Sequence, residues 1–218
     1  MPRTPPSSEP LEVPTGQGPA QVELLPPAGT PRGSLLLGHG AGGGVRTPDL
    51  LAVADAAARA GWLVALVVQP WRVAGRKIAT APPRLDAAWL DVVGHLREHR
   101  VLAAGRLVLG GRSAGARVAC RTAAGLGAAG VCCLAFPLHP PGRPERSRAG
   151  EVPGELPVLV VQGRRDAFGG PEELRAAVPA AEVVAVDGDH GLKADPDAVV
   201  DAVSGWLGRL SGQPEQVP

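Results

Sequence analysis

The sequence has 218 residues, of which 44% are hydrophobic and 20% are charged, a length and composition typical of one globular domain. Its 22 Lys and Arg residues nearly balance 21 Asp and Glu residues, so its net charge gives no argument for binding nucleic acid or an acidic membrane. It contains neither a run of about 18 apolar residues nor the apolar segment of a secretion signal. We therefore expect a cytoplasmic protein, and we expect Cys120, Cys132 and Cys133 to be reduced thiols.

The two ends of the chain differ in composition from its middle. Residues 1–19 are rich in proline and are predicted to form a disordered arm with polyproline character. Residues 211–218 are predicted to be a flexible tail. The folded domain is therefore expected to span residues 20–210.

Within the domain, short apolar runs alternate with helical patterns. An edge strand is predicted first, at residues 21–25. Buried strands are predicted at 34–37, 63–68, 107–109, 131–136, 157–162 and 183–186. Helices are predicted to begin at Thr47-Pro48-Asp49, to present Leu85, Trp89, Val92 and Leu96 on one face, to span 114–124 and 171–178, and to follow the cap Asp195-Pro196-Asp197.

This alternation of strands and helices predicts an α/β fold. Strands that are apolar on both faces belong to a mostly parallel sheet with helices on both sides. Sheets of this kind place their chemistry in loops at the carboxyl ends of the strands. The loops after residues 37, 109, 161 and 186 are therefore where we expect the functional residues.

A candidate nucleophile follows the strand at 107–109. Residues 111–115 read Gly-Arg-Ser-Ala-Gly, the pattern G-x-S-x-G, which exposes a serine on a tight turn between a strand and a helix. The pattern alone is weak, but here it directly follows a predicted strand and opens a predicted helix. Ser113 is therefore the candidate nucleophile, and the alternative is a glycine-rich turn with an idle serine.

A serine hydroxyl needs a base, and the base needs an acid that fixes its tautomer. His190 follows the last predicted strand in Gly188-Asp189-His190-Gly191, and Asp166 follows the strand before it. The chain order Ser113, Asp166, His190 is the order found in α/β-hydrolases. Asp187 and Asp189 also lie near His190 in sequence, and Asp166 has the alternative role of a turn former.

A glycine-rich loop offers an oxyanion hole. Residues 38–44 read Gly-His-Gly-Ala-Gly-Gly-Gly and follow an early strand, so their backbone can approach a substrate closely. The predicted donors are the N–H groups of Ala41 and Ala114, with Gly42 as an alternative to Ala41. His39 is expected to shape this loop. The possible pocket lining comprises His39, Gly42, Arg112 and His139.

Two other motifs point to different functions. Residues 38–43 also match the dinucleotide-binding pattern G-x-G-x-x-G, but no carboxylate ends the next predicted strand, at Val68-Gln69-Pro70. Residues 95–99 match the zinc-protease pattern H-x-x-E-H, but Glu98 points away from the helix face that is predicted to be buried. We expect neither a metal nor an organic cofactor.

The basic segment 71–77 either reaches over the pocket, where it would favour an anionic substrate, or is solvated.

Together these motifs resemble those of the α/β-hydrolases over about residues 20–210. The chain is similar to the small lidless enzymes related to dienelactone hydrolase, and most similar to a hydrolase-like group with a vertebrate testis-expressed member and a relative in the non-specific lethal chromatin complex. The resemblance implies that Ser113 is the nucleophile, His190 the base and Asp166 the acid. Dienelactone hydrolases carry cysteine at the position of Ser113, so their substrate is not implied. The chromatin relative is thought to act as a scaffold.

The predicted function is hydrolysis of a small ester, thioester or related acyl substrate, with a carboxylic ester hydrolase as the enzyme type. Few aromatic residues are available, which favours a small or aliphatic acyl group. The alternatives are acyl transfer by the same triad and a catalytically inactive binding or scaffold protein. The only partner expected is the small acyl substrate, with no nucleic acid and no membrane; the sequence leaves the oligomeric state open.

Overall fold

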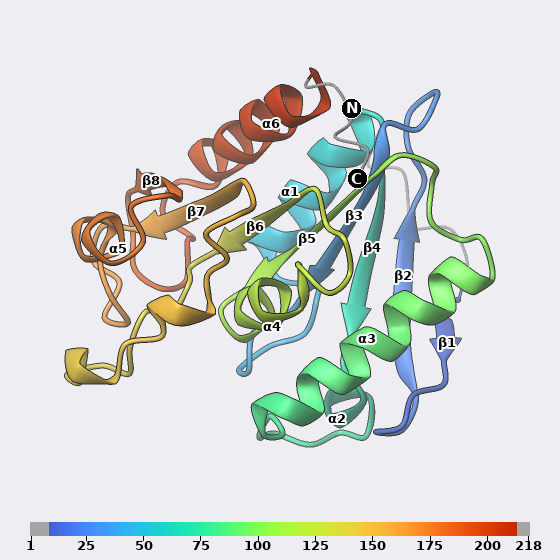
Figure 1. The fold of residues 1–218 in the computed structure, drawn as a ribbon, viewed down its shortest axis with the longest axis horizontal. Helices are drawn as coiled ribbons and strands as arrows, with labels where there is room; N and C mark the ends of the chain where they lie inside the picture. Colours follow the sequence, from blue (N-terminus) through green and yellow to red (C-terminus); the bar gives the residue numbers. More distant parts are fainter. Residues whose placement is uncertain (1–8, 213–218) are drawn as a thin grey trace.

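The structure is a computed structural model that describes residues 9–212. One sheet of eight strands runs through the molecule, with helices against both faces (Figure 1). The strands are β1 Leu11–Val13, β2 Ala20–Leu25, β3 Gly33–Gly38, β4 Trp62–Val68, β5 Arg106–Arg112, β6 Gly130–Leu134, β7 Val158–Gly163 and β8 Glu182–Val186. The α-helices are α1 Pro48–Arg59, α2 Pro70–Val73, α3 Pro82–Glu98, α4 Ala114–Thr122, α5 Pro171–Ala177 and α6 Pro196–Gly212, and two 3-10 turns, Pro144–Arg146 and Ala149–Glu151, lie between β6 and β7.

The order of the strands is β1-β2-β4-β3-β5-β6-β7-β8. Strands β3 to β8 pair parallel with one another, whereas β1 pairs antiparallel with β2 and β2 pairs antiparallel with β4. This arrangement confirms the predicted α/β fold with a mostly parallel sheet. The chain reverses its sequence order at β3 and β4, and such a reversal places functional loops at the carboxyl ends of the neighbouring strands.

The amino-terminal segment differs from the predicted disordered arm. Residues 11–13 form β1, and the side chain of Val13 is fully buried. Consequently β2 is not an edge strand as predicted, because β1 covers its free side. Apolar Leu11 and Val13 flank Glu12, which is the alternation of a strand, and the surrounding prolines obscured it. The rest of the predicted arm, residues 1–8, and residues 213–218 of the predicted tail lie outside the described residues; α6 itself extends to Gly212.

The hydrophobic core lies in two layers because successive side chains of a strand point to opposite faces of the sheet. In β3, Leu36 packs on the side that α3 and α4 cover. Its neighbours Leu35 and Leu37 pack on the side that α1 and α6 cover. All three leucines are fully buried, which explains why this strand is apolar at consecutive positions.

Two helix starts show how far local sequence determines a cap. At α6 the carboxylate of Asp195 accepts a hydrogen bond of 3.1 Å from the N–H of Ala198, as its sequence predicts. At α1 Thr47 is the N-cap residue and Pro48 begins the helix, as predicted. The Thr47 side chain makes no capping hydrogen bond, however, and its Oγ1 is buried without a partner among the described residues.

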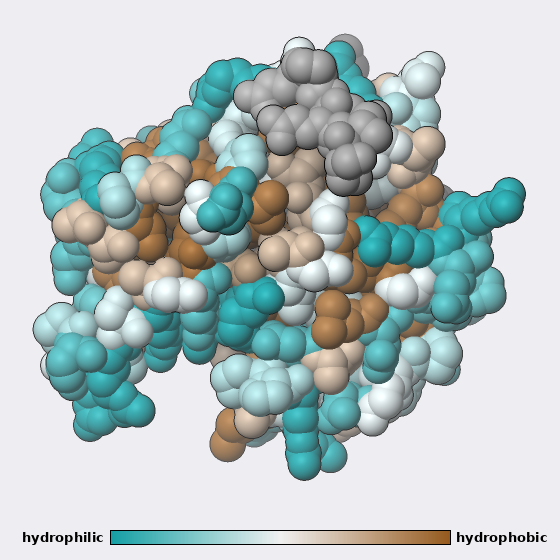
Figure 2. All heavy atoms as spheres, viewed as in Figure 1, coloured by the Kyte–Doolittle hydropathy of each residue, from teal (hydrophilic) through white to brown (hydrophobic). Residues whose placement is uncertain are grey.

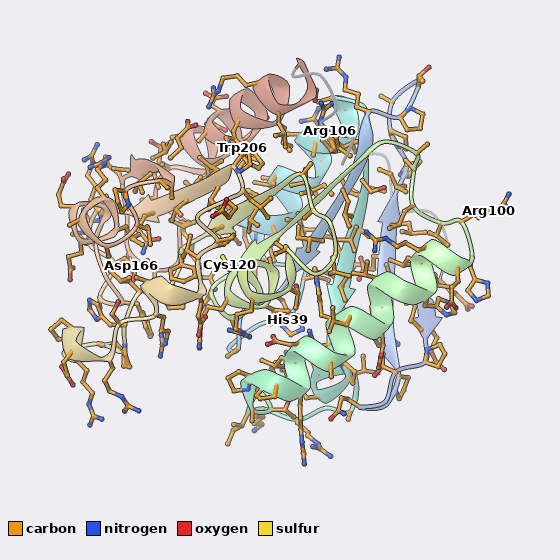
Figure 3. All side chains as sticks on the ribbon, viewed as in Figure 1. His39, Arg100, Arg106, Cys120, Asp166 and Trp206 are labelled. Carbon is orange, nitrogen blue, oxygen red and sulfur yellow. The ribbon has the colours of Figure 1, made fainter. Side chains whose placement is uncertain are left out.

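The carboxyl ends of β3, β5 and β7 meet at one edge of the sheet. Figure 3 shows His39, the labelled residue that follows β3, at the edge of the sheet opposite Arg106, which begins β5.

Hydrophilic residues cover most of the face seen in Figure 2, with small apolar patches between them. Among residues 9–212, no helix has the length and apolarity needed to cross a membrane.

Candidate active site

Ser113 lies at the turn from β5 into α4, in a backbone conformation that side chains rarely adopt. Its φ is 53° and its ψ is −108°, and the glycines around it are required by close packing. A Cβ at Gly111 or at Gly115 would lie 2.4 Å from backbone atoms of Gly38 at the end of β3. The end of β3 therefore packs closely against the turn and the start of α4, and the turn directs the side chain of Ser113 away from the sheet.

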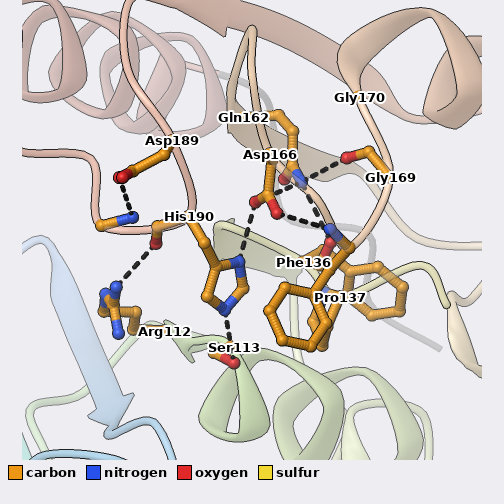
Figure 4. Close-up of polar contacts among 12 residues, drawn as sticks. Arg112, Ser113, Phe136, Pro137, Gln162, Asp166, Gly169, Gly170, Asp189 and His190 are labelled. Carbon is orange, nitrogen blue, oxygen red and sulfur yellow. Dashed lines mark hydrogen bonds and ion pairs between the residues drawn. The ribbon is translucent and has the colours of Figure 1, made fainter. Parts of the chain in front are cut away.

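Three side chains from separate loops form a continuous chain of hydrogen bonds (Figure 4). His190 Nε2 lies 2.9 Å from Ser113 Oγ, and His190 Nδ1 lies 2.8 Å from Asp166 Oδ2. An ionised Asp166 accepts only, so His190 carries its proton on Nδ1 and presents Nε2 as an acceptor for the serine hydroxyl. The structure therefore brings together the three residues that the sequence singles out.

The carboxylate of Asp166 is held in place by its own loop. It is 6% exposed, and its Oδ1 accepts a hydrogen bond of 2.9 Å from the N–H of Phe168. Its Oδ2 accepts a second bond of 2.9 Å from Nε2 of Gln162, which also donates to the carbonyl of Gly169 at 2.8 Å. Sequence reasoning missed Gln162, although a polar residue near the end of an apolar strand was a usable signal.

The two other acidic residues close to His190 in sequence have different hydrogen-bond and ion-pair partners. Asp189 accepts a hydrogen bond of 2.8 Å from the N–H of Gly191, and Asp187 forms an exposed ion pair with Arg164 at 3.3 Å. Asp166 is therefore the acid that orients the imidazole. The ring of Phe168 covers this imidazole, with 4.3 Å between the ring centroids.

Arg112 holds the His190 loop in position. Its guanidinium donates a hydrogen bond of 2.6 Å to the carbonyl of His190 and pairs with the buried carboxylate of Asp49 at 2.9 Å. Asp49 lies in the first turn of α1. Arg112 was predicted as a possible pocket-lining residue, and in the structure it links α1 to the loop that carries His190.

The glycine-rich loop after β3 lies directly against the serine. A Cβ at Gly40 would stand 3.4 Å from Cβ of Ser113, so the backbone of the loop runs beside the serine. Within residues 9–212, neither the N–H of Ala41 nor that of Ala114 donates to a protein acceptor. Both remain candidate oxyanion donors. Gly42 is exposed, and a Cβ there would meet nothing within 4 Å.

His39 joins this loop to the end of β4. Its Nδ1 donates to the carbonyl of Gly40 at 2.9 Å, and its Nε2 accepts the N–H of Gln69 at 3.1 Å. Burial lowers the pKa of His39, which agrees with a neutral ring that uses one nitrogen as donor and one as acceptor. Both nitrogens are occupied, so His39 shapes the loop and is not free to transfer a proton.

His139 and the basic segment 71–77 make separate contacts. His139 Nδ1 contacts the carbonyl of Pro140 at 2.9 Å, and its Nε2 contacts Glu173 on α5 at 3.0 Å. The Pro140 contact raises the pKa of His139. It lines none of the pockets that we describe. In the segment 71–77, Trp71 is buried, whereas the basic side chains Arg72, Arg76 and Lys77 are exposed.

A small apolar pocket, hereafter the Trp71 pocket, begins beside Ala114. Its volume is about 10 Å³, which is room for roughly one water molecule. Its wall includes His39, Gln69, Trp71, Leu85, Trp89 and Ala114. A separate, more open pocket lies on the other side of the site and is lined by His190, Arg165 and Lys193, among others. The site thus has a narrow apolar pocket and a wider, more open one.

The remaining candidates from the sequence lie outside the site. His95 and His99 stack on each other with 4.2 Å between ring centroids, and Glu98 is exposed. Residues 9–212 contain no group of three potential metal ligands. The three cysteines are buried in the core, where burial raises the pKa of Cys132 to about 12, so its thiol is not a nucleophile at neutral pH.

Comparison with known proteins assigns the fold to a family. The model of the alpha/beta hydrolase domain matches residues 31–201, which is most of the chain. The chain belongs to the alpha/beta hydrolase family. The glycine-flanked serine, the histidine after the last strand and the loop after β3 occupy the places where this family positions such groups.

Several solved alpha/beta hydrolases are similar in fold, at low sequence identity. A lidless serine hydrolase from Xanthomonas campestris is 20% identical with a TM-score of 0.74, over 99% of this chain and 100% of that one. Est1E from Butyrivibrio proteoclasticus, solved with ferulic acid, is 16% identical with a TM-score of 0.77, over 93% and 100%. A dienelactone hydrolase from Anabaena variabilis is 18% identical with a TM-score of 0.73, over 94% and 98%. No curated protein matches the sequence.

Proposed function

We propose that the protein is a serine hydrolase that cleaves a small ester, thioester or related acyl substrate. The observation that carries this proposal is the hydrogen-bonded chain from Ser113 through His190 to Asp166, with distances of 2.9 and 2.8 Å. A serine is a poor nucleophile unless a base removes its proton. This geometry supplies the base, and it supplies the acid that keeps the base in the required tautomer.

The proposed reaction has two halves. Ser113 Oγ attacks the acyl carbonyl while His190 Nε2 takes its proton, and the carbonyl oxygen becomes an oxyanion facing the N–H groups of Ala41 and Ala114. His190 then gives the proton to the leaving group, and an acyl-enzyme forms at Ser113. Water that His190 deprotonates releases the acid. Every step uses side chains and amides of this chain, and we propose no metal or organic cofactor.

The comparisons support an esterase. The neighbours with similar folds include lidless serine hydrolases and esterases, and one of them was solved with ferulic acid, an acyl compound. Acyl transfer to an alcohol or amine is a second candidate, because the open pocket beside His190 has room for an acceptor other than water. Product analysis with added alcohols separates transfer from hydrolysis.

An ester assay tests the proposal. We expect turnover of p-nitrophenyl acetate and butanoate by the wild type, and a loss of at least about 10³-fold in kcat for Ser113→Ala, because removal of the nucleophile leaves only binding and the oxyanion hole. The matched control is Ser204→Ala on α6, which should retain wild-type activity. Turnover that is unchanged in Ser113→Ala contradicts the assignment, and no turnover of any acyl ester favours the inactive scaffold.

A further inference from the structure

Arg112 is the residue before Ser113, and its guanidinium contacts three parts of the site. It ends β5, so its backbone is continuous with the serine turn. Its Nη2 donates to the carbonyl of His190 at 2.6 Å, and its Nε lies 2.9 Å from Oδ2 of Asp49. A Cβ at Gly40 would stand 3.3 Å from Nη1, so the third nitrogen lies beside the glycine-rich loop. One side chain therefore joins the loop of the base, the start of α1 and the candidate oxyanion loop.

These contacts close a ring around the reacting atoms (Figure 4). The ring runs along the backbone from Ser113 to Arg112, crosses to the carbonyl of His190 over 2.6 Å, and returns from His190 Nε2 to Ser113 Oγ over 2.9 Å. Residues 187–195, all of which the structure describes, form neither a helix nor a strand that could fix the position of His190. A bond from the residue next to the nucleophile to the backbone of His190 therefore restricts where the imidazole lies.

Asp49 holds the guanidinium in this orientation. The side chain of Asp49 is 3% exposed and that of Arg112 is 17% exposed, so both charges are largely shielded from water and each needs the other. A guanidinium is planar with donors in fixed directions, so an ion pair at Nε also sets the direction of Nη2 toward His190. A lysine ends in a single nitrogen and cannot reproduce both contacts. The geometry thus requires arginine at this position.

We propose that Arg112 is a positioning residue of the reaction, which fixes the backbone of His190 relative to Ser113, and that Asp49 acts through it. The inference rests on the proposed function, since it assigns roles within the same site. Arg112 bonds to the carbonyl of His190 and not to its imidazole, so it acts through the base. Proton transfer requires hydrogen-bond distance between Nε2 and Oγ, and a small displacement of the base slows it strongly. Loss of the contact should therefore lower kcat and leave KM nearly unchanged.

The kinetic test uses Asp49→Asn/Arg112→Met, which removes both charges and leaves neither buried without a partner. We expect kcat for p-nitrophenyl butanoate to fall by about 10- to 100-fold, with a change in KM below about threefold. Arg112→Lys keeps a charge beside Asp49 but loses the bond to His190, and its kcat should fall by about tenfold. The matched control is Arg117→Met on α4. Arg117 is 20% exposed and pairs with Glu151, and its variant should keep the wild-type kcat.

The imidazole of His190 reports its position without turnover. Its nitrogen chemical shifts, measured by NMR at a pH where the ring is neutral, show which nitrogen carries the proton. In the wild type we expect only the tautomer with the proton on Nδ1, because Asp166 accepts it at 2.8 Å. Both Arg112 variants should show a mixture of the two tautomers, because the ring no longer lies in one place. Arg117→Met should give the wild-type shifts.

Several results would overturn the inference. Wild-type kcat or wild-type imidazole shifts in a folded Arg112 variant would do so, as would a fall in kcat/KM that comes from KM alone. An equal effect of Arg117→Met on kcat and on the shifts would show a general loss of packing instead. If the double variant does not fold, Arg112→Lys decides, since it keeps the charge pair. If the wild type turns over no ester, the proposed function fails, and the shifts still decide whether Arg112 positions His190.

Discussion

At the scale of single residues, the site depends on which nitrogen of His190 carries the proton. Asp166 settles this, because its Oδ2 lies 2.8 Å from Nδ1 and its other contacts, Gln162 Nε2 and the N–H of Phe168, are donors. A carboxylate surrounded by donors stays an acceptor, so His190 must donate to it. The free Nε2 then faces Ser113, which is the arrangement that a general base requires.

Replacing this acid tests the tautomer directly. In Asp166→Asn the new amide can present a donor to Nδ1, and the imidazole would then carry its proton on Nε2, where it cannot accept one from Ser113. We expect kcat for p-nitrophenyl esters to fall by on the order of 10³ to 10⁴ with little change in the free energy of unfolding.

The control for this variant is Asp189→Asn. Asp189 is next to His190 in sequence, but it bonds to the N–H of Gly191, so its amide variant should remain active. If Asp189→Asn loses activity and Asp166→Asn keeps it, the assignment of the acid is wrong.

At the scale of secondary-structure elements, the site depends on close packing of β3 against the start of α4. The glycine-rich loop and the serine turn come from these two elements, and they meet at Gly38, Gly111 and Gly115. Bringing a strand end and a helix start into backbone contact leaves no room for side chains. The same packing sets the distance between the candidate oxyanion donors and Ser113.

The variant Gly115→Ala tests this packing. Its Cβ would be 2.4 Å from the carbonyl carbon and oxygen of Gly38, so β3 or α4 must shift. We expect a loss of at least about 1–3 kcal/mol in the free energy of unfolding by urea, together with lower kcat/KM for esters.

Gly94→Ala is the matched control for that measurement. Gly94 lies inside α3, and a Cβ there would meet nothing within 4 Å. Alanine favours a helix over glycine by about 0.5–1 kcal/mol, so this variant should be as stable as the wild type or more so. Equal stability of Gly115→Ala and Gly94→Ala would contradict the close-packing explanation.

At the scale of the whole molecule, the sequence predicts the fold well because strands that are apolar on both faces and alternate with helices are typical of layered α/β proteins. The three residues Ser113, Asp166 and His190 could be predicted for the same reason: each follows a recognisable strand, and the carboxyl ends of parallel strands share an edge.

The sequence was less informative where a contact depends on distant residues. The link from Arg112 to Asp49 and to the His190 loop joins elements far apart in the chain, and nothing in the local sequence indicates it. Gln162 beneath Asp166 is a different case, since it is four residues away and its polar side chain near the end of an apolar strand was a usable signal. Strand β1 was missed because prolines dominate its surroundings. Thr47 takes the predicted N-cap position, but its hydroxyl is buried and makes no hydrogen bond there among the described residues.

The most direct test of the proposed function is labelling with a fluorophosphonate, which reacts with an activated serine. The intact protein is treated with the probe and digested, and the modified peptide is identified by mass spectrometry. We predict one adduct, on Ser113, that is absent from Ser113→Ala and strongly reduced in His190→Ala, since the histidine activates the hydroxyl. A folded wild-type protein that takes up no label, or that takes it up on a different serine, would contradict the account.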